Sequence, residues 1–106
     1  MGFLNLFRQP DINAGVAQFQ QTPGAVLLDV RTAEEYRAGH IPGSTNLDLQ
    51  MLHTASSLIP TLETPLFVYC HSGARSRIAV SQLQSMGYTN ATNIGGITAF
   101  RGNLRR

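Results

Sequence analysis

Two short, uninterrupted apolar runs limit what this chain can fold into more than any other feature of its sequence. The first covers residues 25–30 and includes one charged side chain, Asp29, and the second covers residues 66–69. Apolar runs of this length, with no alternation of polar residues, are typical of strands buried on both faces in parallel sheets. Helical segments alternate with the runs along the chain. This pattern predicts an α/β fold in which helices cover both faces of a mostly parallel sheet.

Capping residues and turn residues predict where the other elements begin and end. Asp11 is expected to cap a helix, and Thr32 with Glu35 has the spacing of a capping box. The predicted helices cover residues 12–21, 32–37, 48–58 and 75–86, with a terminal helix beginning near residue 98. The predicted strands cover residues 25–30, 44–47, 66–69 and 91–94.

Length, charge and cysteine content narrow the class of protein. A chain of 106 residues fits one compact domain, expected here over residues 11–106 after an N-terminal segment of residues 1–10. The net charge is +2 and the basic residues are scattered arginines, so the sequence lacks the basic stripe of a nucleic-acid-binding protein. The single cysteine, Cys70, permits neither an internal disulfide nor a cysteine-based metal cage. We therefore expect a cytoplasmic protein without a metal or a cofactor.

The first residues of the chain contain four apolar side chains, at positions 3, 4, 6 and 7. This stretch has no basic region before it and is too short for a signal peptide or a membrane span. We expect these side chains to pack on the domain or to form a short edge strand, and we expect no membrane partner.

Reactive and charged residues follow both apolar runs. Asp29 and Arg31 lie at the end of the first run, and residues 70–75 follow the second. Ligands of parallel sheets usually bind beyond the carboxyl ends of the strands. The sequence therefore places its candidate site where these two segments meet.

The segment at Cys70 joins a buried strand directly to a helix through one tight loop. Hydrogen bonds to a charged group are worth about 1.5–3 kcal/mol each, whereas a helix dipole supplies about 0.3–1 kcal/mol. The loop N–H groups are therefore expected to favour the thiolate of Cys70 more than the dipole does.

Gly73 suits a backbone that turns around an anion, and Arg75 is expected to bind an oxyanion or to hold the loop closed. Arg77 is expected to add positive potential at the rim, and His71 is a candidate general acid or base. The alternative is that Cys70 is a buried structural cysteine.

Three groups of motifs together resemble the rhodanese family, in the family's order and spacing. The first group covers residues 28–31, 35–36 and 39–44, the second is Val68-Tyr69-Cys70-His71-Ser72-Gly73-Ala74-Arg75-Ser76, and the third covers residues 95–96 and 99–100. The resemblance extends over about residues 11–103. It implies a rhodanese-like α/β fold with a parallel sheet of about five strands.

The resemblance also implies a reaction and a set of roles. Cys70 would attack a small anionic sulfur donor such as thiosulfate, hold the sulfur as a persulfide and pass it to cyanide, a thiol or a protein acceptor. The backbone of His71, Ser72, Gly73, Ala74 and Arg75 would bind the donor. Asp29 and Arg31 match the family's upstream pair and are expected to form an ion pair or to support the edge of the active site. The turn residue His40 and the Gly95-Gly96 pair are also expected to have structural roles.

Two other functions are alternatives to sulfur transfer. Cell-cycle phosphatases and arsenate reductases share a related fold, but they place five residues between the cysteine and the arginine, and this chain places four. The shorter loop favours a terminal sulfur over a phosphate or an arsenate. The second alternative is a non-enzymatic rhodanese module for binding or regulation, or a relay subunit that serves a protein partner.

Overall fold

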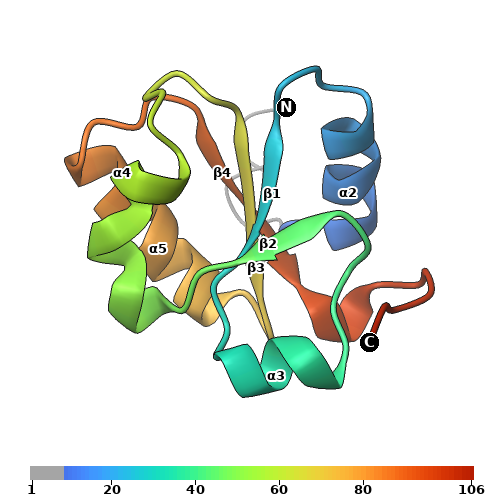
Figure 1. The fold of residues 1–106 in the computed structure, drawn as a ribbon. Helices are drawn as coiled ribbons and strands as arrows, with labels where there is room; N and C mark the ends of the chain where they lie inside the picture. The colour runs from blue at the N-terminus through green and yellow to red at the C-terminus, as the bar shows by residue number, and fades with distance from the viewer. Residues whose placement is uncertain (1–8) are drawn as a thin grey trace.

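The computed structural model describes residues 9–106, so the expectations for residues 1–8 lie outside the described residues. Within this range four parallel strands form one sheet in the order β2-β1-β3-β4 (Figure 1). The strands are β1 (Val26–Asp29), β2 (Ser44–Asn46), β3 (Leu66–Cys70) and β4 (Ala91–Gly96). The expectation of about five strands is one too many for the described residues. Outside the sheet they add a single antiparallel bridge, between His40 and Arg105, which is too short to form another strand.

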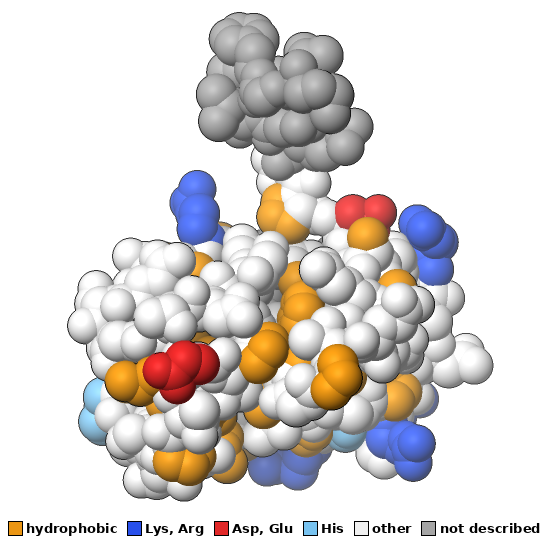
Figure 2. Space-filling view, turned by 90° about the horizontal axis from the view of Figure 1, so that it is seen from above, with side chains coloured by type: hydrophobic (Ala, Val, Ile, Leu, Met, Phe, Trp, Pro, Cys, Tyr) orange, Lys and Arg blue, Asp and Glu red, His pale blue; other side chains and the backbone are white. Residues whose placement is uncertain are grey.

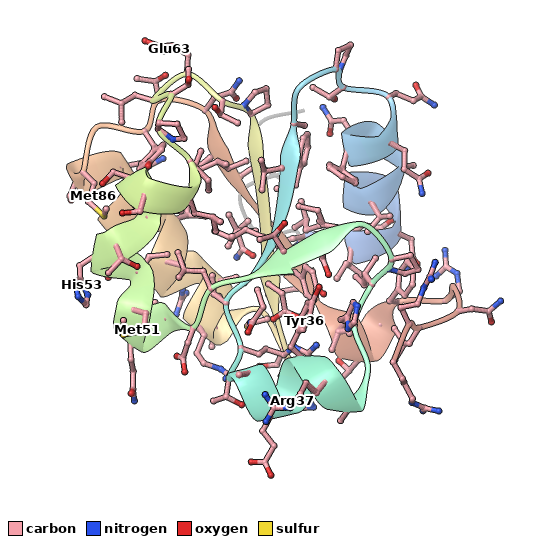
Figure 3. All side chains as sticks on the ribbon, in the orientation of Figure 1. Tyr36, Arg37, Met51, His53, Glu63 and Met86 are labelled. Atoms are coloured by element: carbon pink, nitrogen blue, oxygen red, sulfur yellow. The ribbon has the colours of Figure 1, made fainter. Side chains whose placement is uncertain are left out.

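Helices cover both faces of the sheet, as predicted (Figure 1). Helix α2 (Ile12–Gln20) covers one face, and the 3₁₀ helix η1 (Leu49–Thr54) with α4 (Ala55–Leu58) and α5 (Ala74–Ser85) covers the other. The short helix α3 (Ala33–Ala38) lies beyond the carboxyl end of β1. Figure 3 shows Met51 and His53 of η1 on the side of this second helical layer that faces away from the sheet.

The core consists of two clusters separated by the sheet. Alternate strand residues belong to opposite clusters: Leu27 and Phe67 pack on the α2 side, while Leu28 and Val68 pack on the α5 side. Both sides of β1 and β3 are therefore apolar, which explains why neither run alternates with polar residues.

Capping follows the prediction at three helices. The Asp11 side chain accepts from the N–H groups of Asn13 and Ala14 at the start of α2. Thr32 and Glu35 form the capping box of α3, with N···O distances of 2.9 and 3.1 Å. The Asp48 side chain accepts from the N–H of Gln50, but residues 49–58 form a 3₁₀ helix and a short α-helix instead of one α-helix.

The predicted terminal helix is wrong, because only the three residues Ile97–Ala99 form a 3₁₀ turn, η2. The side chain of Asn13 explains where this turn ends. It donates to the carbonyl of Ala99 at 2.9 Å and accepts from the N–H of Arg101 at 2.9 Å. The Ala99 carbonyl and the Arg101 N–H therefore bond to Asn13 and not to the backbone of a helix, and Phe100 between them is extended.

The end of the molecule opposite α3 carries its apolar side chains in several small groups (Figure 2). The large apolar side chains that are exposed in the described residues come from separate elements; they are Met51, Leu58, Leu62, Ile78 and Leu104. None of the helices in residues 9–106 has the length and apolar composition required to cross a membrane.

Candidate active site

Cys70 is the last residue of β3, and it is 1% exposed. Its side chain points to the α5 side of the sheet with that of Val68. The chain then turns within residues 71–73 and enters α5 at Ala74. Gly73 makes this turn with φ +101°, a left-handed conformation that favours glycine over other residues. The sulfur is thus enclosed by the turn and the first residues of α5.

The N–H of Gly73 donates to Cys70 Sγ at 3.0 Å. Burial raises the pKa of the Cys70 thiol, but the Ser76 hydroxyl and the N–H groups of Ser76, Gly73 and Ser72 lower it by more. The net effect is a lowered pKa, so the loop favours the thiolate, which is the nucleophilic form of cysteine.

Arg75 is held by Glu35 in a two-pronged ion pair. Its two terminal nitrogens donate to Glu35 Oε1 and Oε2 at 2.8 and 2.9 Å, joining the first turn of α5 to α3. The Arg75 guanidinium, with further help from Thr32, lowers the pKa of Glu35 to about 2. Of the two roles predicted for Arg75, holding the loop closed fits this arrangement better than an open fork for an oxyanion.

The Gly95-Gly96 pair lies against the backbone of the active-site loop. A Cβ on Gly96 would come within 2.6 Å of Ser72 Cα and even closer to the carbonyl oxygen of His71. Gly95 has φ +108°, so its conformation also favours glycine. The close approach of two backbones explains why the chain needs glycine at residue 96.

Asp29 and Arg31 form a buried ion pair, with 2.7 Å between Arg31 Nη2 and Asp29 Oδ2. Arg31 also donates to the carbonyl of Gly39 at 2.8 Å, and its guanidinium lies 5.8 Å from the centre of the Tyr69 ring. The turn residue His40 stacks on Tyr36, with 3.7 Å between ring centres. The Arg31 contacts join the carboxyl end of β1 to the turn before β2, and the stack joins α3 to the same turn.

The remaining predicted site residues lie at the surface around the loop. His71, Ser72, Ala74 and Arg77 are exposed. A pocket of about 610 Å³ opens beside the loop and is lined by Ser72, Gly73, Ala74, Arg77, Asn93 and neighbouring residues, but not by Cys70. Among residues 9–106, His, Cys, Asp and Glu side chains form no group of three that could hold a metal ion.

Sequence reasoning missed three side chains that contact the loop. Glu35 was assigned to a helix cap, and its bond to Arg75 spans 40 residues. Ser76 and Asn93 bond to each other at 2.7 Å beneath the loop and had no assigned role. The position of Ser76 within the loop motif was a usable signal, whereas for Asn93 no local pattern marks the contact.

Comparison with known proteins identifies the family. A family model for the rhodanese-like domain matches residues 13–103. The chain belongs to the rhodanese-like family. Human single-domain sulfurtransferase TSTD1 has a similar structure, with a TM-score of 0.73 and 30% identity over 87% of this chain and 95% of that protein.

Two relatives differ in how much of their own length matches this chain. This chain is 36% identical to adenylyltransferase and sulfurtransferase uba4 of Ogataea parapolymorpha over 85% of its length, but it spans only 23% of that protein. It is 37% identical to thiosulfate sulfurtransferase GlpE of Pseudomonas entomophila over 69% of this chain and 66% of the relative.

Proposed function

We propose that this protein is a rhodanese-type sulfurtransferase that carries sulfur on Cys70 as a persulfide. The observation that carries the proposal is the lone thiol at the end of β3, which accepts the Gly73 N–H at 3.0 Å and has a lowered pKa. Its relatives include proteins named thiosulfate sulfurtransferase and single-domain sulfurtransferase. Thiosulfate, or a persulfide with the same exposed terminal sulfur, is therefore the proposed donor.

In the donor step the Cys70 thiolate attacks the terminal sulfur of thiosulfate. A new S–S bond forms at Cys70, the S–S bond of thiosulfate breaks, and sulfite leaves with the bonding electron pair. The N–H groups around the thiolate then face the terminal sulfur of the persulfide, which is also an anion, and stabilise it.

In the acceptor step a nucleophile attacks the terminal sulfur of the persulfide. Attack by cyanide gives thiocyanate, and attack by a thiol gives a new persulfide. In both cases the S–S bond to Cys70 breaks, and Cys70 is released as the thiolate that began the cycle. The acceptor in the cell is proposed to be a thiol, on a small molecule or on a protein, since the lowered pKa makes Cys70 a good leaving group. The lone free cysteine fits the reducing conditions of the cytoplasm, where we propose that the protein acts.

The surrounding residues have different proposed roles. The backbone of residues 71–75 binds the donor, and within it Arg75 acts chiefly by holding the loop to Glu35. Arg77 adds positive charge at the rim, since it is exposed and lines the neighbouring pocket. Asp29 and Arg31 support the strand ends from within the core. The retained nucleophile favours an enzyme over a module that only binds or regulates.

Steady-state kinetics with thiosulfate and cyanide test this proposal. A persulfide intermediate predicts ping-pong kinetics, in which reciprocal plots at different cyanide concentrations are parallel. Cys70→Ser should remove the activity and leave the fold intact, while the exposed and distant His53→Ala serves as the control. Intersecting plots, or thiocyanate production by folded Cys70→Ser, would contradict the proposed mechanism.

A further inference from the structure

We propose that Asn93 is a positioning residue of the active-site loop, which holds the Gly73 carbonyl and so helps to fix Gly73 in the conformation that points its N–H at Cys70 Sγ. The inference rests on the sulfur-transfer function proposed above. Asn93 lies in β4 and is half-buried, and no motif of the loop includes it.

The position of Asn93 follows from an irregularity in the sheet. Asn93 pairs with Val68, but Tyr69 pairs with Gly95, so Ile94 is an extra residue on β4. Asn93 shares the α5 side of the sheet with Val68, whereas Ile94 packs into the cluster on the α2 side. Bulges of this kind often occur beside active sites, where they redirect the chain. Here the bulge lets the chain bring Gly95 and Gly96 alongside the Cys70 loop.

The side-chain amide of Asn93 joins three segments of the chain. Its Oδ1 accepts from the Ser76 hydroxyl of α5 at 2.7 Å and from the N–H of Gly95 at 3.0 Å. Two donors on one oxygen determine which way the amide faces, so Nδ2 is directed toward the loop. There Nδ2 donates to the carbonyl oxygen of Gly73 at 3.4 Å.

The Gly73 carbonyl also accepts from the N–H of Arg77 in α5 at 3.1 Å, and the Ser76 hydroxyl lies at the same distance from it. Ser76 is fully buried, and the shorter contact of its hydroxyl is with Asn93 Oδ1, so its single proton holds the Asn93 amide in place. The Gly73 carbonyl is thus held by the Asn93 amide and the Arg77 N–H, while the Gly73 N–H donates to Cys70 Sγ at 3.0 Å. Gly73 is left-handed, with φ +101°, and the bonds to its carbonyl keep the neighbouring N–H directed at the sulfur.

The pH dependence of Cys70 alkylation tests the proposal without using sulfur transfer. Cys70 is the only cysteine, so iodoacetamide uptake followed by intact mass reports on this thiol alone. The midpoint of the rate against pH gives the thiol pKa, and altered access changes the rate but leaves the midpoint in place. In Asn93→Ala we expect the midpoint to rise by about one pH unit. At a pH below both midpoints the thiolate fraction should then be about tenfold lower than in the wild type, which corresponds to about 1.4 kcal/mol.

A double-variant cycle separates positioning from a general loss of packing. Because the Ser76 hydroxyl holds the Asn93 amide that bonds to Gly73, Asn93→Ala should raise the midpoint less in a Ser76→Ala background than in the wild type. The control is Thr92→Ala, an exposed neighbour on β4, which should leave the midpoint unchanged. If Asn93→Ala does not fold, Asn93→Thr takes its place, since a hydroxyl can still accept the Gly95 N–H and threonine suits a strand.

An unchanged midpoint in a folded Asn93 variant would overturn the proposal, as would an equal rise in Thr92→Ala. Additive effects of the Asn93 and Ser76 variants would also overturn it, because they would then act through different groups. Failure of the sulfur-transfer function is distinguishable: the wild type would form no persulfide, while its alkylation midpoint would remain below that of the Asn93 variants.

Discussion

Replacing Glu35 with glutamine isolates the charge that holds Arg75. Glutamine also fits the third position of a capping box, so the bond to the Thr32 N–H and the start of α3 are retained. The variant loses the negative charge that faces the guanidinium at 2.8 and 2.9 Å. Any change in stability therefore reports on the link between α3 and the active-site helix.

The magnitude follows from the pKa of Glu35. Lowering this pKa from 4.5 to about 2 corresponds to about 3 kcal/mol of folding free energy above pH 4.5. The two side chains are 35% and 32% exposed, so solvent screens part of this amount. Fully exposed pairs are worth about 0.2–1 kcal/mol, and we expect about 1–2 kcal/mol for this half-buried pair. Because the folded pKa is the lower one, the stabilisation is present above pH 4.5 and is lost as the pH falls toward 2.

Urea unfolding from pH 7 down to pH 2 measures this contribution. At pH 7 the free energy of unfolding of Glu35→Gln should lie about 1–2 kcal/mol below that of the wild type. The difference should shrink between pH 5 and pH 2. Glu34→Gln is the matched control, an exposed carboxylate on the same helix, and its stability should change by less than about 0.5 kcal/mol. Equal stabilities of the two variants at pH 7, or a difference that does not shrink in acid, would refute this account of the pair.

Three further substitutions test the loop and its support. Gly96→Ala places a methyl group within 2.6 Å of Ser72 Cα, so the loop must shift. We expect the free energy of unfolding in urea to fall by about 1–3 kcal/mol and sulfur transfer to be reduced. Wild-type values of both would refute the close approach. Arg31→Leu leaves the Asp29 carboxylate buried without its partner and should lower the free energy of unfolding by about 3–5 kcal/mol; a loss below 1 kcal/mol would mean that the pair supports little. Arg75→Ala should slow persulfide formation by about tenfold in stopped-flow assays of sulfite release, because the loop loses its tie to α3; unaltered donor kinetics would reduce Arg75 to a surface residue.

Local signals in the sequence predicted most of the fold. The apolar runs at residues 25–30 and 66–69 became β1 and β3, because burial on both faces leaves a continuous apolar pattern. The capping residues Asp11 and Thr32 began helices at the expected positions, since each acts within three residues along the chain. The terminal helix failed because a distant side chain, that of Asn13, bonds the backbone after η2.

The residues of the candidate site also divide into those that local sequence predicts and those that depend on contacts between distant segments. Cys70 and Gly73 are found from the sequence because the strand, loop and helix are contiguous. Glu35 and Asn93 reach the loop from 40 and 20 residues away, and such contacts depend on how α3 and β4 pack around α5. Periodicity and capping contain no information about this packing, so the groups that position the loop could be identified only from the structure.

The intact mass of the protein before and after thiosulfate, without reductant, tests the central claim most directly. We predict a gain of one sulfur in the wild type, which is lost again on addition of cyanide, and no gain in Cys70→Ser. An unmodified, folded wild type with a free Cys70 thiol would contradict the claim that this cysteine accepts sulfur from thiosulfate.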